Sequence, residues 1–354
     1  MGKRIGILTF HNGINYGAYF QCFSLYKHLE SLGHQPEVIN YKSFSFWFKE
    51  KKHLLYNKPK YHRSWEVLWK NFKKIRQFKI AQKEIVNSPL TFSHSKINDL
   101  SHKYDFIVVG SDIVWCFDDD LIGFDPIYFG YYLNPKKLIS YAPSFGPTSP
   151  EVNLSDEIKK GLLKFDNISV RDENSKNIID RNLHISPPVV LDPTFLIDDL
   201  NKYGKPIKDD GYILVYSYHT PKKYIKYLKK YAKNEGLKLI AVGYYCDWCD
   251  KNILNISPFK WLTFFKNASL VITSTYHGTI FSLLNRKPFV TIDNKPTHYK
   301  TGQLLKSFKI NNRLINSLPD FKEQINTEIN YKSVEKYMNK ETEKSKSYLN
   351  ESLL

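Results

Sequence analysis

The chain has 354 residues, of which 42% are hydrophobic and 25% charged, a composition that is typical of a globular protein and excludes a disordered or fibrous one. Lysine and arginine outnumber aspartate and glutamate by 52 to 35, and the net charge of +17 favours an anionic partner or surface. No apolar run of about 18 residues is present, and Lys3 to Leu8 has the pattern of a strand rather than of a signal peptide, so we expect a cytoplasmic protein.

The first 41 residues have the pattern of a βαβ unit. Residues 5–10 are apolar, residues 11–17 form a loop that contains glycine, and residues 18–32 carry apolar side chains at helical spacing. Gly33 is a typical helix terminator, and residues 37–41 read as a second strand. This order of elements predicts a doubly wound α/β fold.

Residues 43–95 differ in character, because they contain many aromatic side chains among lysines and show no strand pattern. We expect a helical insertion in the first domain. Its basic, aromatic face could lie on an anionic membrane surface, since lysines meet lipid head groups and aromatic rings favour the interface. The alternative is a set of helices that pack on the domain and keep their lysines in solvent.

Two series of apolar strands follow, separated by polar turn residues near positions 200 to 210. A chain of this length exceeds the usual size of a single hydrophobic core, so two domains are expected. We predict a first domain over 1–204, a second over 205–330, and a C-terminal helix over 331–354 that packs back on the body. The predicted strands are 105–109, 138–142, 167–170 and 189–191, then 212–216, 238–242, 270–273 and 288–292.

Glycines and polar side chains follow the strands of the first domain. The loop from Thr9 to Tyr19 lacks both the GxGxxG pattern and the P-loop lysine, which argues against a dinucleotide or NTP site of those kinds and leaves a sugar or a different phosphate open. In Val109-Gly110-Ser111-Asp112-Ile113-Val114-Trp115, a carboxylate and an aromatic ring could bind a sugar together. Asp112 as a structural loop cap is an equal alternative.

Two further strand ends, Tyr141 to Gly146 and Ser169 to Asp172, belong to the same predicted edge of the sheet. Arg171 is a candidate anion clamp, because a guanidinium binds carboxylate or phosphate in a bidentate way. Its alternative is a salt bridge with Asp172 or another acid. Asp192-Pro193 is interpreted as a turn that closes the domain.

In the second domain, the apolar run Ala268 to Thr273 leads directly into Ser274-Thr275-Tyr276-His277-Gly278-Thr279-Ile280-Phe281. A strand that ends in hydroxyl residues, a histidine and a glycine, and then opens a helix, suits an anion beside a group that transfers protons. Tyr216 to His219 follows another strand and could face the first domain across a cleft. His11 and His219 stand in weaker sequence contexts.

The four cysteines, Cys22, Cys116, Cys246 and Cys249, are too few and too scattered for a disulfide framework. Cys246 and Cys249 have CxxC spacing, but no second ligand pair lies near them, so we interpret them as part of a loop after a strand rather than a zinc or redox site.

The order and spacing of these loops resemble the polysaccharide pyruvyl transferase family. The resemblance rests on Asn15 to Ala18, Val109 to Asp112 with Trp115, Tyr141 to Gly146, Ser169 to Arg171, Leu191 to Pro193, and Ser274 to Phe281. It implies two Rossmann-like domains in a GT-B-like arrangement with the active site between them. It also implies phosphoenolpyruvate as the donor substrate, no further cofactor or metal, and a pyruvate ketal on a sugar of a surface or capsular polysaccharide precursor.

The resemblance also implies roles for single residues. His277 would act as general acid and base, Asp112 would assist the acceptor hydroxyl, and Arg171 would bind the donor. Some branches of the family have arginine where this chain has Tyr276, so the donor charge would be met by Arg171, Arg286, Lys287 or helix amides. The expected substrate-binding residues are Asn15, Tyr16, Gly17, Gly110, Ser111, Trp115, Tyr141, Ser144, Tyr216, Tyr218, Ser274, Thr275, Tyr276, Gly278 and Lys287.

The acceptor is expected to be a sugar on a polyprenyl diphosphate, so that the enzyme would act at the inner face of the membrane. A GT-B glycosyltransferase that uses a nucleotide sugar is one alternative. The other is a polyanion-binding protein that exploits the net charge, although no nucleic-acid recognition motif is present and nucleic acid is not expected as a partner.

Overall fold

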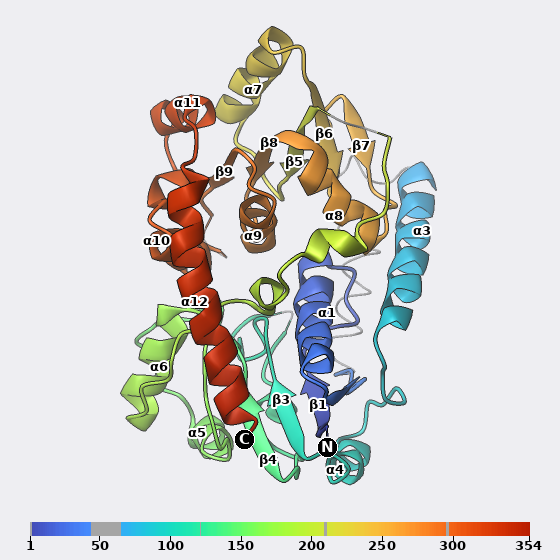
Figure 1. Cartoon of the computed structure of the whole chain (residues 1–354), viewed down its shortest axis with the longest axis vertical. Helices are drawn as coiled ribbons and strands as arrows, with labels where there is room; N and C mark the ends of the chain where they lie inside the picture. Colours follow the sequence, from blue (N-terminus) through green and yellow to red (C-terminus); the bar gives the residue numbers. More distant parts are fainter. Residues whose placement is uncertain (1, 44–64, 121, 209–210, 295–296) are drawn as a thin grey trace. The chain divides into compact units, whose positions relative to one another are not determined.

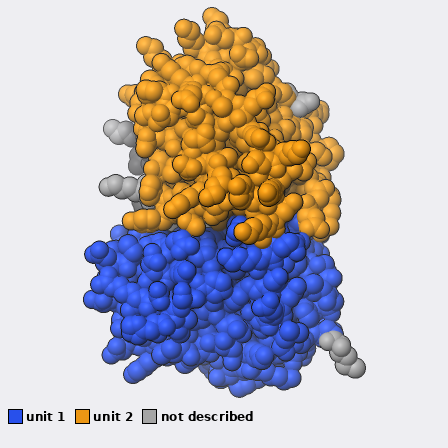
Figure 2. Space-filling model, turned by 60° about the vertical axis from the view of Figure 1, so that its left-hand side comes forward, with its two compact units in different colours: residues 1–67, 82–197, 341–354 blue, residues 68–81, 198–340 orange. Residues whose placement is uncertain are grey.

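The computed structural model describes residues 2–43, 65–120, 122–208, 211–294 and 297–354, with side chains from residue 72 onward in the helix that begins at residue 65. The chain divides into two compact units (Figure 2). Unit 1 contains residues 1–67, 82–197 and 341–354, and unit 2 contains residues 68–81 and 198–340. The most aromatic part of the expected insertion, residues 44–64, lies outside the described residues.

Unit 1 is built on a parallel sheet with the strand order β2-β1-β3-β4. Figure 1 labels β1, β3 and β4. The strands are short, and β3, which is apolar, is buried along its whole length. The segments expected as strands at 167–170 and 189–191 join this region through single bridges, between Ile139 and Asn167 and between Val170 and Val189. The strands are β1 (Arg4–Leu8), β2 (Gln35–Val38), β3 (Phe106–Val109) and β4 (Lys137–Ser140).

The helix α1 (Tyr16–Ser31) lies almost entirely inside unit 1. The Asn15 side chain caps it by accepting from the amides of Gly17 and Ala18. Gly33 follows its end with a φ of 81°, a left-handed conformation that favours glycine. In the described part of unit 1, the other helical segments are η2 (Gln82–Glu84), α4 (His94–Ser101), η3 (Pro126–Phe129), α5 (Asp156–Leu162), α6 (Glu173–Leu183) and η4 (Pro193–Leu196).

Unit 2 has its own parallel sheet, with the order β10-β9-β8-β5-β6-β7. The four strands expected from the sequence form its centre, and two short strands that were not expected, β7 and β10, form its edges. The strands are β5 (Tyr212–Tyr216), β6 (Lys238–Val242), β7 (Lys251–Ile253), β8 (Ala268–Thr273), β9 (Phe289–Ile292) and β10 (Leu314–Ile315). The helical segments are η5 (Leu200–Tyr203), α7 (Lys222–Asn234), α8 (Pro258–Asn267), α9 (Tyr276–Leu284), α10 (His298–Ser307), η6 (Asn311–Arg313) and α11 (Leu318–Asn326).

Two helices belong to a different unit from the one that their sequence position suggests. Most of α3 (Trp65–Ala81) is part of unit 2, where the buried Lys74 ammonium donates to the carbonyl of Gly243 at 3.2 Å. The insertion expected in the first domain is therefore shared between the units. The final helix, α12 (Tyr331–Ser352), contributes residues 331–340 to unit 2 and its remainder to unit 1.

Among the described residues, no helix combines the length and the hydrophobicity needed to cross a membrane.

Candidate functional site

The strands of each sheet run parallel, so the loops that follow them lie along one edge, which is where α/β proteins place ligand groups. In unit 1 these loops follow β1, β3 and β4, and in unit 2 they follow β5, β6, β8 and β9. Most of the residues singled out from the sequence are in these loops. Their burial and their contacts differ between the units.

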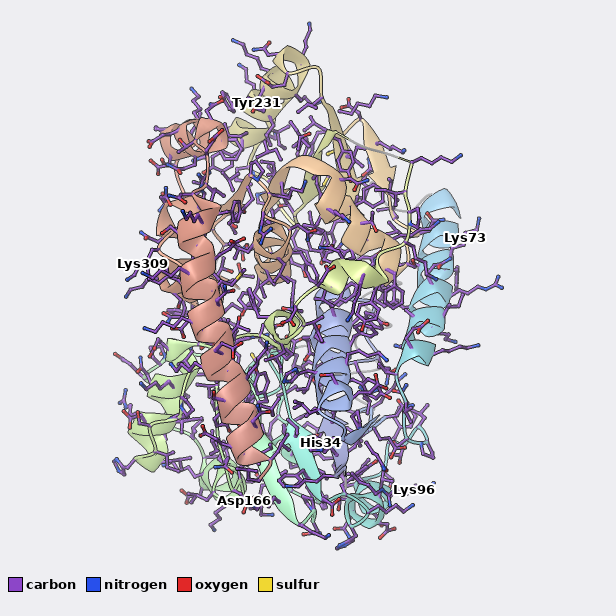
Figure 3. The ribbon with its side chains drawn as sticks, in the orientation of Figure 1. His34, Lys73, Lys96, Asp166, Tyr231 and Lys309 are labelled. Atoms are coloured by element: carbon purple, nitrogen blue, oxygen red, sulfur yellow. The ribbon has the colours of Figure 1, made fainter. Side chains whose placement is uncertain are left out.

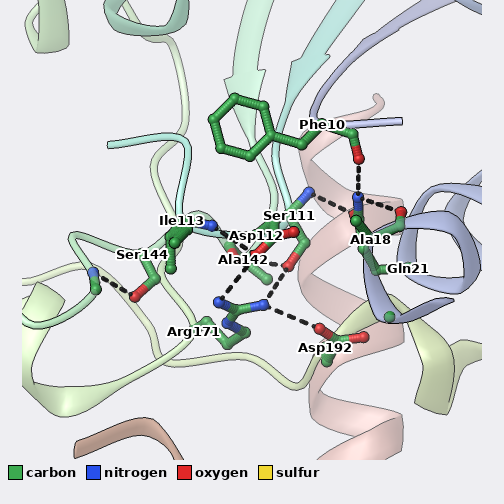
Figure 4. A network of polar contacts seen from close by, with 12 residues as sticks. Phe10, Ala18, Gln21, Ser111, Asp112, Ile113, Ala142, Ser144, Arg171 and Asp192 are labelled. Atoms are coloured by element: carbon green, nitrogen blue, oxygen red, sulfur yellow. Dashed lines mark hydrogen bonds and ion pairs between the residues drawn. The ribbon is translucent and has the colours of Figure 1, made fainter. Parts of the chain in front are cut away.

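Arg171 is at the centre of a buried polar network in unit 1 (Figure 4). Its Nη1 donates to Asp192 Oδ2 at 3.1 Å, and both side chains are 0% exposed. Its Nη2 lies 3.7 Å from Asp112 Oδ1. Arg171 therefore forms an internal salt bridge, which was the alternative to its role as an anion clamp. Its partners are Asp192 and Asp112 rather than Asp172.

Asp172 instead caps α6, where its Oδ1 accepts from the Ser175 amide at 2.8 Å. Its Oδ2 accepts from the Ser144 hydroxyl at 2.6 Å. Both Asp172 and Ser144 are buried, so Ser144, expected to bind substrate, holds the start of α6 in this structure.

A second part of the network fixes the loop after β3. The Ser111 amide donates to Gln21 Oε1 at 3.2 Å, and the Ser111 hydroxyl donates to the carbonyl of Ala142 at 2.9 Å. Gln21 in turn donates to the carbonyls of Phe10 and Ala18 (Figure 4). Its side-chain nitrogen also lies 3.0 Å from the Thr9 hydroxyl, to which it donates. Gln21 was not predicted from the sequence, although a polar residue within the apolar pattern of 18–32 is a signal for such a buried partner.

The backbone of the same loop is unusual. The peptide bond between Gly110 and Ser111 is cis, and Asp112 has a φ of 72°. At Gly110, which has a φ of 109°, a Cβ would lie 2.5 Å from the carbonyl oxygen of Tyr141. Only glycine fits there, so Gly110 serves the close approach of two loops.

The aromatic residues expected to contact a sugar in unit 1 are in the core. Trp115 is 0% exposed, its Nε1 donates to the carbonyl of Tyr128 at 2.8 Å, and its ring packs on Phe145. Tyr141 is equally buried and donates to the carbonyl of Leu191, and Tyr16 is buried in the first turn of α1. The expectation that a sugar stacks on Trp115 is therefore wrong, because the ring has no exposed face.

In unit 2, the loop between β8 and α9 has the form that the sequence suggested. Thr275 caps α9 by accepting from the Gly278 amide at 2.9 Å. A Cβ at Gly278 would overlap the hydroxyls of Thr273 and Thr275, so the helix can start close to the strand only with glycine there. His277 lies in the first turn of α9 and is partly exposed.

The loop after β5 is tied to this one. The Ser217 hydroxyl donates to Ser274 Oγ at 2.8 Å, which also accepts from the Tyr218 amide at 3.0 Å. The Tyr218 ring is 63% exposed and lies against Tyr244, with their centroids 4.4 Å apart. Tyr216 is buried, which raises the pKa of its hydroxyl, so of the two expected tyrosines only Tyr218 has an accessible ring.

The cations near His277 differ from those expected. Lys287 comes two residues before β9, which runs parallel to β8, so it lies at the edge of the sheet opposite to Ser274. Arg286 is beside it and pairs with Glu335. Lys300, which was not predicted from the sequence, has its ammonium 5.6 Å from the centroid of the Tyr276 ring. Lys300 therefore replaces Lys287 as the cation beside this loop.

A histidine and a carboxylate were also missed in the loop after β9. The imidazole Nδ1 of His298 lies 2.9 Å from Asp293 Oδ2. Asn294, between them in the chain, donates to the carbonyl of Ser274 and accepts from the Thr297 hydroxyl at 3.0 Å. The available signal was that Asp293 follows directly on a buried strand.

The two histidines in weaker sequence contexts differ in burial. His11 is buried, its Nδ1 donates to the carbonyl of Thr9 at 3.0 Å, and burial lowers its pKa. His219 is exposed, and its carbonyl accepts from the Ser217 hydroxyl. All four cysteines are free thiols. Within the described part of the chain, no group of three or more His, Cys, Asp or Glu residues could hold a metal ion.

Comparisons with known proteins agree with this fold. The chain is similar in structure to Arabidopsis thaliana UGT89C1 complexed with UDP-L-rhamnose, with 8% identity, coverage of 100% of this chain and 98% of that chain, and a TM-score of 0.54. It is also similar to S. aureus MnaA in its structure with UDP, with 12% identity, coverage of 96% and 91%, and a TM-score of 0.50. These similarities show the fold alone, two Rossmann-like domains of the GT-B-like class. A search of curated proteins finds no match. A family model described as polysaccharide pyruvyl transferase matches residues 15–296.

Proposed function

The chain belongs to the polysaccharide pyruvyl transferase family, and from this premise we propose that it transfers the enolpyruvyl group of phosphoenolpyruvate to a sugar. The acceptor is a sugar of a surface or capsular polysaccharide precursor, carried on a polyprenyl diphosphate. The product is a ketal that bridges two hydroxyls of that sugar, and phosphate is released.

The loop between β8 and α9 is the observation that carries the proposal. It places His277, a partly exposed residue, in the first turn of a helix whose amide end favours anions. Lys300 adds a positive charge beside Tyr276 at the same helix end. Phosphoenolpyruvate is a small trianion that must gain a proton, so these groups match both of its requirements.

In the proposed reaction, the imidazolium of His277 donates a proton to the methylene carbon of the donor. C2 becomes electrophilic and is attacked by a hydroxyl of the sugar, whose proton returns to His277. A histidine is suited to both steps because its ring nitrogens can donate and accept a proton. The bond between C2 and the phosphate oxygen then breaks, and a second hydroxyl closes the ring.

The direct test is incubation of the protein with phosphoenolpyruvate and lipid-linked sugars, followed by measurement of released phosphate and of the mass of the sugar. We expect phosphate release that depends on the acceptor, together with a mass gain that matches a ketal. No release with any acceptor, together with no thermal shift on adding the donor, would overturn the proposal.

The role of His277 has its own test. The H277A variant is expected to lose turnover by about 10²- to 10⁴-fold, the usual contribution of a general acid or base, while its circular dichroism spectrum and thermal midpoint stay close to those of the wild type. The matched control is H219A, which alters an exposed histidine of the neighbouring loop. Retained activity in H277A would show that His277 is not the general acid and base of the reaction.

A glycosyltransferase that uses a nucleotide sugar is the second candidate, because the solved structures named above contain UDP-L-rhamnose and UDP. It predicts that a nucleoside diphosphate raises the thermal midpoint and that phosphoenolpyruvate does not. The opposite pattern supports the pyruvyl transfer reaction.

We also propose peripheral contact with an anionic membrane, based on α3. Its described part exposes Phe72 (59%) and Ile80 (48%), and Lys73, Arg76 and Lys79 are exposed on the same helix; Lys73 is labelled in Figure 3. Aromatic and basic side chains together favour the membrane interface. A triple K73Q/R76Q/K79Q variant should sediment less with anionic vesicles and keep its activity on a soluble acceptor, whereas unchanged sedimentation would reject the contact.

A further inference from the structure

Resting on the proposed function, we infer that His298, oriented by Asp293, is a second proton-transferring residue, which accepts the proton of the second sugar hydroxyl as the ketal ring closes. His277 then serves the methylene carbon and the first hydroxyl, and His298 serves ring closure. Asp293 is a positioning residue in this assignment.

The geometry of the pair is that of an oriented base. His298 Nδ1 lies 2.9 and 3.0 Å from the two oxygens of Asp293, and an ionised carboxylate only accepts hydrogen bonds, so Nδ1 is the donor. In the neutral ring, Nε2 is then the atom that accepts a proton. The His298 side chain is 54% exposed and that of Asp293 21%, so a substrate can reach the imidazole.

Both partners are held by secondary structure. Asp293 directly follows β9, and its amide donates to the carbonyl of Ile315 at 2.9 Å, in β10. His298 is the first residue of α10. A base at the start of a helix, held by a carboxylate at the end of a strand, is positioned more precisely than a base on a loop without such support.

The pair is connected to the loop that carries His277. β8 and β9 are neighbouring parallel strands, with Thr273 paired to Thr291, so the loops after them start side by side. Asn294 joins the loops, because it donates to the carbonyl of Ser274 and accepts from the amide and the hydroxyl of Thr297, the residue before His298. Lys300, two residues after His298, lies against Tyr276.

Ring closure calls for a group that takes the proton of the second sugar hydroxyl. Two hydroxyls each lose a proton, the methylene carbon gains one, and the phosphate that leaves with the electron pair of the C2–O bond takes the other. Once His277 has taken back the proton of the first hydroxyl, it is protonated again and cannot accept the second proton before it has given one away. His298 would take the second from the attacking hydroxyl and pass it to the departing phosphate, which leaves both histidines as they began.

Asp112, expected from the sequence to assist the acceptor, is engaged elsewhere. Its Oδ1 accepts from the Ile113 amide at 2.9 Å and lies 3.7 Å from the guanidinium of Arg171. A carboxylate that stabilises a buried arginine is poorly suited to taking up a proton, since that would remove the partner charge. The base for ring closure is therefore better sought in unit 2.

The test compares two substitutions of His298 in the full-length protein, with phosphate release from phosphoenolpyruvate and a sugar acceptor as the readout. Asparagine can still donate to Asp293 but has no Nε2 base, so H298N separates a structural role from a catalytic one. We expect both H298N and H298A to lower kcat by about 100-fold, with the KM for the donor changed less than about threefold. Added imidazole should restore part of the activity of H298A.

Three controls accompany these variants. The D293N variant should lose about tenfold in kcat, because the ring is less well oriented, and its pH-activity profile should shift. H102Q, which alters an exposed histidine of unit 1, should be unchanged. A thermal shift on adding phosphoenolpyruvate to each variant shows that it is folded and binds the donor.

Three outcomes would contradict this assignment. Wild-type rates with an unchanged pH profile in H298A would overturn it and leave the proposed function intact. Recovery of full activity in H298N alone would show that only the hydrogen bond to Asp293 matters, which is a structural role. No phosphate release from the wild-type protein would reject the donor chemistry and this role of His298 with it.

Discussion

The two units present loops at the same edge of a parallel sheet, yet these edges differ in what they expose. In unit 1, Arg171, Asp192 and Ser111 are buried and bind one another. In unit 2, the corresponding loops leave Tyr218 and His298 largely accessible and His277 partly so. At the first edge, Arg171 and the groups around it are engaged in internal polar contacts, and the second edge has side chains that a ligand can reach.

This difference shows why motifs at strand ends need a structure for their interpretation. A charged residue that follows a strand can neutralise another charge of the same unit or can bind a substrate, and both uses require the same residue types. The predictions below test whether the edge of unit 1 mainly supports stability and how the edge of unit 2 is built.

The largest effect is expected for Arg171. R171M would leave Asp192 buried without its cation, and breaking a buried ion pair in this way costs about 3–5 kcal/mol of unfolding free energy. Urea unfolding followed by circular dichroism measures the loss. R181M, which removes an exposed arginine of α6, is the matched control. A change below about 1 kcal/mol in R171M would show that the edge of unit 1 is not held by this pair.

The next effect concerns the start of α9. In G278A, the added methyl group would overlap the Thr273 and Thr275 hydroxyls, so α9 must shift, at a cost of about 1–3 kcal/mol. G302A is the control within unit 2, since a Cβ there meets only Leu314 at 3.7 Å. Thermal unfolding measures the stability of both variants, and we expect G302A to be neutral or slightly stabilising. Equal losses of stability in the two variants would contradict the close packing at Gly278.

A smaller loss is expected for the cap of the same helix. T275A removes the acceptor of the Gly278 amide, and loss of an N-cap costs about 1 kcal/mol. T275S keeps the hydroxyl and should retain most of the stability. Because the capped turn carries His277, T275A should also weaken the thermal shift caused by phosphoenolpyruvate, and an undiminished shift would separate donor binding from the order of this turn.

The smallest effect is a pH dependence in unit 1. Burial lowers the pKa of His11 below its usual value near 6.5. As the pH falls below about 6.5, the unfolded chain binds a proton that the folded protein resists, so stability decreases by at most about 1.4 kcal/mol per pH unit. H11N can still donate to the carbonyl of Thr9 but does not titrate, and its unfolding free energy should fall less between about pH 7 and pH 5. If the unfolding free energies of the wild type and H11N fell equally with pH, His11 would not be the cause of the pH dependence.

The sequence predicted the elements that have strong patterns. β3 and β8 are continuous apolar runs with polar residues directly after them, so their type and the position of the following loops could be predicted. β7 and β10 were missed because they have three and two residues, too few for a pattern. Their pairing depends on the neighbouring strands of the folded sheet.

The site was harder to predict because its partners are distant in the chain. Asp192 is 21 positions from Arg171, and no local pattern shows that these two charges meet. The residues next to Trp115 in the sequence do not show whether its ring is exposed or buried. The ring is buried because Phe145 and Phe165 pack on it in the folded unit. Lys287 is near His277 in sequence, but α9 lies between them in the chain, and Lys287 comes before β9, at the opposite edge of the sheet. Lys300 is farther away in sequence, yet its ammonium lies over the Tyr276 ring.

The segment 341–354 has a consequence for the order in which the protein can be made. Ser345 accepts from the Leu191 amide at 2.9 Å, and the Tyr348 hydroxyl donates to the carbonyl of Ser140 at 2.9 Å, all within unit 1. These residues follow the whole of unit 2 in the chain. During synthesis from the N-terminus, the strands of both sheets therefore emerge before this segment, and unit 1 reaches its final set of contacts only when α12 has left the ribosome.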